Sequence, residues 1–160
     1  MDKISYFNDM LVRFEEIFYH ELSGCAQPKV EFVGTDFLQS KKIEGDTVEK
    51  VVENCIKEIT AAGLVEDITY SIHGFGVLLK LNMKGCIHMP KEIKLKKDGV
   101  HPYLCPIANM ILDQILEILN YAGVYTAEMK IEENKGECIV KCAIYENVDK
   151  IGQVSDWTKI

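Results

Sequence analysis

The spacing of apolar residues changes between two periods along this chain, and that change constrains the fold more than any other feature. Over residues 4–22 and 46–59, apolar side chains recur every three or four positions, which predicts two amphipathic helices. Over residues 68–83 the spacing becomes two, on both sides of the turn Gly74-Phe75-Gly76. This pattern predicts a β-hairpin with one buried face.

The second half of the chain repeats the change from helix to hairpin. Residues 106–119 have a helical apolar stripe that starts at a proline, and residues 125–144 alternate around the turn Asn134-Lys135-Gly136. A further strand is expected at Ile93 and Leu95, because charged residues flank both. The segment that contains Val30 and Phe32 holds either a short strand or an ordered loop.

The order α-α-β-β-α-β-β predicts an α+β fold, in which three main helices cover a mostly antiparallel sheet of about four to five strands. The two hairpins are expected to join in one sheet, because an isolated hairpin is only marginally stable. A chain of 160 residues fits a single domain, which we expect over residues 1–146. Residues 147–160 are expected to form a tail that Trp157 anchors.

The charge of the chain argues against nucleic acid as a partner. The net charge is −7 at pH 7, whereas nucleic-acid affinity depends on Lys and Arg replacing condensed counterions. The basic run Lys91, Lys94, Lys96 and Lys97 is therefore expected to be a solvated strand face. No apolar stretch approaches the ~20 residues that span a bilayer, and no signal peptide is recognisable. We expect a cytoplasmic protein with reduced cysteines.

Cys105 is the most chemically distinctive residue, because it directly precedes the proline that opens the third helix. At the N-cap position its sulfur faces unpaired backbone N–H groups and the positive end of the helix dipole. Both effects favour a thiolate. The alternative is a buried cysteine at the start of a helix, with nothing to attack or bind.

Cys86, His88, His101 and Cys105 also form a candidate metal site. Sulfur and imidazole donors suit zinc, and two of each could close a tetrahedral structural site. Their spacing matches no familiar zinc motif, so a surface loop with a hydrogen-bonded histidine is the alternative. Cys55, Cys138 and Cys142 share faces with aliphatic residues and are interpreted as core.

The last hairpin follows an apolar helix and has the sequence GVYTAEMKIEENKGECIVKCAIYE, with Gly136 in its turn. This segment, together with the element order over about residues 46–146, resembles the 4-vinyl-reductase-type hydrocarbon-binding domains, which share a fold with certain TRAPP trafficking subunits. It implies a small-molecule-binding or sensory domain, often dimeric, with an apolar pocket between helices and sheet and sometimes a zinc site. Cys138 or Cys142 would be the family's strand cysteine, whereas Met129 and Ile131 stand where an earlier paired cysteine would be.

We therefore predict a small-molecule module that binds or senses an apolar or amphipathic ligand, with zinc as the candidate cofactor near Cys105 and a homodimer as the candidate assembly. The first alternative is a thiol-dependent enzyme, in which Cys105 is the nucleophile and His101 the base. The second alternative is a structural partner-binding protein whose helices bury a subunit interface.

Overall fold

The structure is a computed structural model that describes residues 2–74 and 78–151. Its helices are α1 (Lys3–Leu22), α2 (Ala26–Lys29), α3 (Asp36–Gln39), α4 (Val48–Ala61), α5 (Met89–Lys97) and α6 (Pro106–Leu119). Its strands are β1 (Asp67–His73), β2 (Leu78–Lys84), β3 (Gly123–Glu132) and β4 (Glu137–Tyr145). Phe75 and Gly76 of the expected first turn, Val77 of the strand expected after it, and the expected anchor Trp157 lie outside the described residues.

The four strands form one antiparallel sheet in the order β1-β2-β4-β3. Each hairpin pairs its own strands, and β2 joins β4 in the middle of the sheet, with Leu81 opposite Val140. The pairing of β3 with β4 is irregular between Thr126 and Glu128, where the register shifts. The predicted α+β class, the antiparallel sheet and the joining of the two hairpins are therefore confirmed.

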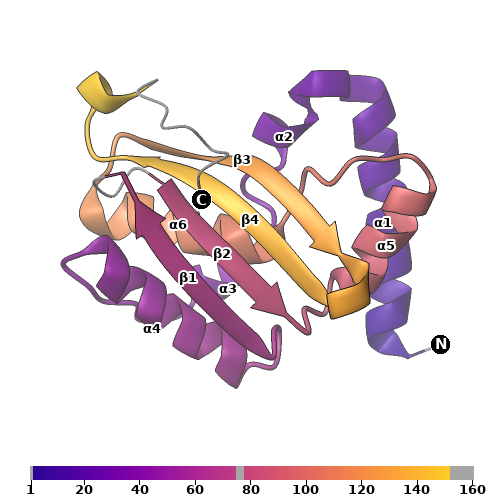
Figure 1. The fold of residues 1–160 in the computed structure, drawn as a ribbon, viewed down its shortest axis with the longest axis horizontal. Coiled ribbons are helices and arrows are strands. Elements are labelled where there is room, and N and C mark those ends of the chain that lie inside the picture. The colour runs from indigo at the N-terminus through magenta and orange to yellow at the C-terminus, as the bar shows by residue number, and fades with distance from the viewer. Residues whose placement is uncertain (1, 75–77, 152–160) are drawn as a thin grey trace.

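Helices α4 and α6 pack against each other and cover one face of the sheet, while α1 packs against α5 at one end of the molecule (Figure 1). The main core lies between this sheet face and the two covering helices. Its fully buried side chains include Val52, Ile59, Leu79, Leu81, Ile111, Ile115 and Val140. Cys55 and Cys142 are fully buried among them, as the helical stripe around Cys55 and the strand alternation around Cys142 predicted.

The strand expected at Ile93 and Leu95 is wrong, because these residues belong to helix α5. Alternation over so few residues does not separate strand from helix, and Pro90 in the first turn with Gly99 after the end is a helical signature. The basic run is therefore not a strand face. Lys91 points inward with 1% of its surface exposed, whereas Lys96 and Lys97 remain exposed.

The helix starts follow from local capping. Thr47 caps α4, and its hydroxyl oxygen accepts a hydrogen bond from the Lys50 N–H at 3.3 Å. Cys105 caps α6 and Pro106 is the first helical residue, as predicted. The segment around Val30 and Phe32 forms turns between α2 and α3 rather than a strand. No helix in residues 2–74 and 78–151 is both long and apolar enough to cross a membrane.

Candidate functional site

A small cavity lies where the end of β2, the start of α5, the start of α6 and the start of β4 meet. Three thiols line it, those of Cys86, Cys105 and Cys138, together with the side chains of His88 and Glu92. Three methionine side chains also line it, namely those of Met83, Met89 and Met129. Its volume is about 10 Å³, which is roughly the minimum for one water molecule. We call it the cysteine cavity.

The structure brings three of the four predicted ligands to this cavity and leaves out the fourth. Cys86, His88 and Cys105 line it, but the exposed His101 does not. The His101 ring lies 6.4 Å from the ring of Tyr19 on α1, centroid to centroid. The non-helical segment between His101 and Cys105 separates the two side chains, so the predicted nucleophile and base are not assembled as a pair.

Cys138 joins the cavity from β4, a contact that was not predicted. Antiparallel pairing places Cys138 opposite Met83, three residues before Cys86. The sequence did indicate that Cys138 faces inward with Val140, and the structure confirms that it is buried. The elements that Cys138 contacts depend on the pairing of β2 with β4. That pairing joins strands that are far apart in the sequence.

The thiol of Cys105 has the predicted geometry but not the predicted acidity. Its sulfur accepts a hydrogen bond from the Ala108 N–H at 3.4 Å, which favours the thiolate. Burial is the larger effect, however, and it raises the pKa of Cys105 well above the ordinary value, with further increases from the nearby Cys138 and Cys86. The expectation of a thiolate-like Cys105 is therefore corrected, because removal from water outweighs the helix terminus.

The other two thiols of the cavity behave in the same way. Burial raises the pKa of Cys138 to about 12 and also raises the pKa of Cys86. All three groups are neutral thiols at physiological pH. Across residues 2–74 and 78–151, no group of three or more His, Cys, Asp or Glu side chains is arranged so that it could hold a metal ion. Zinc binding therefore stays a prediction.

His88 is held as a neutral ring. Burial, followed by the nearby positive charge of Lys91, lowers its pKa from 6.5 to about 4. Among the described residues, its buried Nδ1 has no hydrogen-bond partner. Because folding lowers the pKa of His88, the contribution of this residue to the stability of the fold is complete above pH 6.5 and is lost as the pH falls through 4.

We accordingly expect the His88 ring to remain neutral at about pH 5.5 in the folded chain, which ring chemical shifts in an NMR pH titration would reveal. The urea-unfolded chain is the control, because there the same ring should titrate near its ordinary value of about 6.5. Titration of the folded ring at that same pH would contradict the burial account of this cavity.

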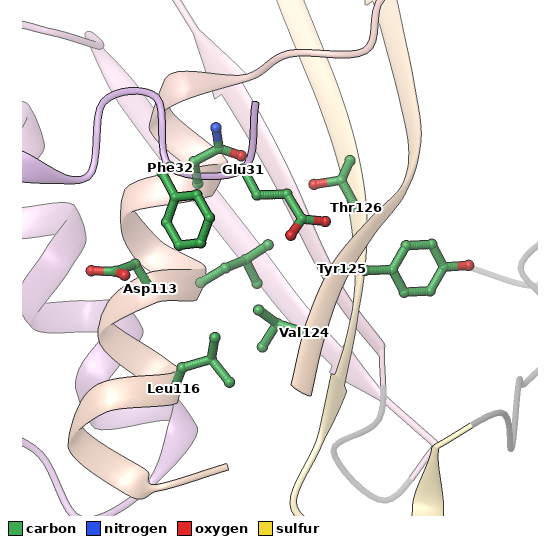
Figure 2. A pocket seen from close by; sticks show the side chains of 9 residues that line it. Glu31, Phe32, Asp113, Leu116, Val124, Tyr125 and Thr126 are labelled. Carbon is green, nitrogen blue, oxygen red and sulfur yellow. The ribbon is translucent and has the colours of Figure 1, made fainter. Parts of the chain in front are cut away.

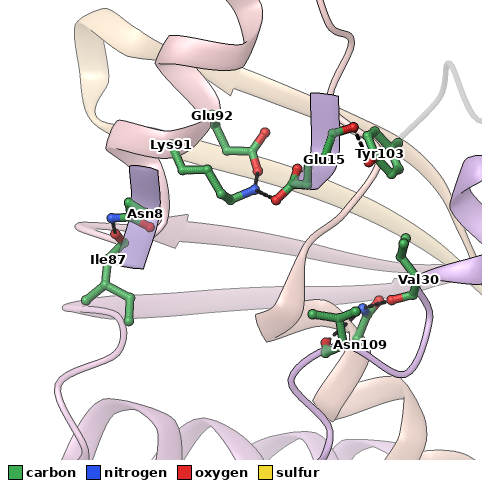
Figure 3. A network of polar contacts seen from close by, with 9 residues as sticks. Asn8, Glu15, Val30, Ile87, Lys91, Glu92, Tyr103 and Asn109 are labelled. Carbon is green, nitrogen blue, oxygen red and sulfur yellow. Dashed lines mark hydrogen bonds and ion pairs between the residues drawn. The ribbon is translucent and has the colours of Figure 1, made fainter. Parts of the chain in front are cut away.

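A buried ion network shares Glu92 with the cysteine cavity (Figure 3). Lys91 Nζ is 2.6 Å from a Glu15 carboxylate oxygen and also pairs with Glu92. The exposed fractions of the three side chains are 0% for Lys91, 2% for Glu15 and 5% for Glu92. Tyr103 strengthens the same junction by donating its hydroxyl hydrogen to the Glu15 carbonyl at 2.6 Å. The network joins α1 to α5.

A second cavity lies between α6, β3 and the turn at residues 30–34, and we call it the α6–β3 cavity (Figure 2). Its volume is about 90 Å³. Leu112, Leu116 and Val124 supply apolar walls, and Phe32 covers them from the turn. Figure 2 shows the Glu31 side chain reaching into the space between α6 and β3, while the Tyr125 ring points away from it.

Polar contacts fix the turn that covers this cavity. The Asn109 side-chain amide on α6 donates hydrogen bonds to the carbonyls of Val30 at 2.9 Å and Val33 at 3.1 Å (Figure 3). On the far side Gln39 donates to the Asp113 carboxylate at 3.1 Å. The walls are thus held in place by the fold, as expected for a preformed binding site.

The carboxyl group of Glu31 is affected by its position. Burial raises its pKa above the ordinary value of 4.5. Asp113 lines the same cavity, so two acidic side chains border one apolar surface.

No protein-family model, curated protein or solved structure matches this chain. The likeness to the 4-vinyl-reductase-type domains therefore stays a prediction.

Sequence patterns did not identify the α6–β3 cavity. Its walls come from three segments far apart in the chain, and Leu112 was interpreted only as part of a helical stripe. Asn109 is the one residue whose type could have indicated the turn that covers this cavity. A polar residue on the buried side of an apolar helix requires partners, and here those partners are the carbonyl groups of the covering turn.

Proposed function

We propose that this chain is a small-molecule-binding or sensory module, and that it binds an amphipathic ligand in the α6–β3 cavity. The observation that supports this most is one cavity that combines an apolar wall with an inward-reaching carboxylate, that of Glu31. Ligand sites usually pair apolar walls with a small number of placed polar groups.

The size and charge of the cavity limit what it can hold. A volume of about 90 Å³ is smaller than the ~150 Å³ of a cavity that holds benzene, so a short alkyl group fits and any larger part would lie outside. The Glu31 carboxylate, which reaches into this space, favours a positively charged head group. The ligand class we propose is therefore a small amine with an alkyl group.

The test uses three probes with the same alkyl chain: n-butylamine, n-butanol and butyrate. Each is titrated into the isotope-labelled chain while backbone amide shifts are followed by NMR. We expect n-butylamine to bind most tightly, with a Kd of about 1 mM, and to shift amides of the covering turn, α6 and β3. Equal binding of all three probes, or shifts elsewhere only, would refute the proposed site.

Glu31→Gln provides the matching variant. We expect it to weaken n-butylamine binding about 3- to 10-fold, because a charge-assisted contact becomes a neutral one, and to leave n-butanol binding unchanged. Glu49→Gln is the control, since Glu49 is exposed on α4 and does not line the cavity. The same loss in both variants would indicate a general charge effect rather than a contact at this site.

A further inference from the structure

Helix α1 has two different faces. Its inner face packs on α5 and buries Asn8, Val12 and Glu15, of which only Val12 is apolar. Its outer face is far more apolar and is exposed. The large apolar side chains of α1 with high exposure are Ile4 (54%), Tyr6 (53%), Phe7 (56%), Met10 (39%), Phe14 (57%), Ile17 (57%) and Phe18 (42%). A contiguous patch of this kind marks an interaction surface.

The centre of this outer face follows a strict heptad spacing. One line of residues, separated alternately by four and three positions, runs through Lys3, Phe7, Met10, Phe14, Ile17 and Glu21. We call this line the outer stripe. Such spacing is typical of a seam between two helices. Its four apolar members lie in the middle, and its two charged ends have opposite sign.

We infer that the outer stripe is a homodimer interface, in which α1 pairs antiparallel with α1 of a second copy across a two-fold axis. In that arrangement Lys3 lies opposite Glu21 of the second copy at both ends, and Met10 lies opposite Phe14. A parallel arrangement would place Lys3 against Lys3 and Glu21 against Glu21. The charges of the stripe therefore fit the antiparallel pairing.

The area of the outer face fits such an interface. Four of the seven half-exposed side chains are aromatic, and an aromatic side chain buries about 150–250 Å² when fully covered, so the face as a whole offers on the order of 700 Å². A stable interface buries about 800 Å² on each partner. The stripe also borders a shallow groove of about 660 Å³ toward Lys94 of α5, which has room for side chains of the second copy.

The inferred dimer is tested by sedimentation of the full chain at concentrations up to about 1 mM. We expect a dimer, and we expect Phe14→Glu to weaken it at least 100-fold, because the two-fold axis places two buried charges in one interface. Val148→Glu is the control, since Val148 is 74% exposed outside α1 and should leave the dimer intact. A chain that stays monomeric, or a Phe14→Glu variant that still dimerises, would overturn the inference.

Charge exchange tests the direction of pairing. Lys3→Glu and Glu21→Lys are each expected to weaken the dimer about 3- to 10-fold, because each turns two attractive pairs into repulsive ones. The double variant should return to within about 2-fold of the original affinity, since all pairs are again opposite in sign. In a parallel dimer the single variants would have no effect, and that result would overturn the antiparallel arrangement.

Discussion

Lys91→Met is expected to lower the free energy of unfolding by about 3–5 kcal/mol at pH 8, because it leaves two buried carboxylates without their positive partner. Lys91 has no exposed side-chain surface, and both of its partners, Glu15 and Glu92, are nearly as buried. Urea denaturation followed by circular dichroism measures the change. A loss below about 1 kcal/mol would contradict the assignment of this network as the junction between α1 and α5.

The loss of stability in Lys91→Met should be larger at high pH than at low pH. Burial, the largest cause, raises the pKa of Glu15 from 4.5 to about 7 even with Lys91 present, and it also raises the pKa of Glu92. Without Lys91 both values rise further, so the penalty is complete only above those raised values and disappears as the pH falls below 4.5. We expect the loss to shrink to about 1 kcal/mol at pH 5.

Two further variants separate the network from ordinary surface charge. Lys94 is on the same helix as Lys91 and forms a partly exposed ion pair with Asp9 of α1 at 3.0 Å. Lys94→Met removes this pair and should change the free energy of unfolding by less than about 0.5 kcal/mol. Replacing all three members together, with Glu15→Leu, Lys91→Met and Glu92→Leu, should recover most of the loss, because apolar groups can substitute for a complete buried ion network.

Gly34→Ala is expected to destabilise the fold by about 2–4 kcal/mol and to weaken n-butylamine binding at least 10-fold. Gly34 has a φ of +93°, and a Cβ there would lie 2.8 Å from Cβ of Pro106 and 3.2 Å from its Cα. Neither atom can move without shifting the start of α6. The added methyl group should therefore lift the turn that holds Glu31 and Phe32 over the α6–β3 cavity.

Thermal unfolding and the n-butylamine titration together measure this effect. Gly24→Ala is the control, because no atom lies within 4 Å of the position where its Cβ would be, and it should change stability by less than about 0.5 kcal/mol. A Gly34→Ala variant with unchanged stability and binding would show that the turn is not held against α6 in the way described here.

The fold was largely predictable because its elements are locally consistent. Pro106 at a helix start and the alternation around Val140 each point to one structure, and the structure confirms them. The failure at Ile93 and Leu95 has the opposite cause. In that segment the inward-facing side chains include Lys91 and Glu92, and polarity alone places both on the surface.

The candidate site was predictable only within segments. Cys86, His88 and Cys105 were grouped because they are close in sequence, and the structure brings these three to one cavity. Cys138 was missed because only the pairing of β2 with β4 brings it there. The acidity of Cys105 was misjudged for a related reason, since a helix start is visible in the sequence and the depth of its burial is not.

The most direct measurement of the proposed function is the position of bound n-butylamine, determined from intermolecular NOEs on the isotope-labelled chain. We expect contacts between the alkyl protons and the methyl groups of Leu112, Leu116 and Val124. Contacts confined to the outer stripe of α1 or to the cysteine cavity, with none to these three residues, would contradict it.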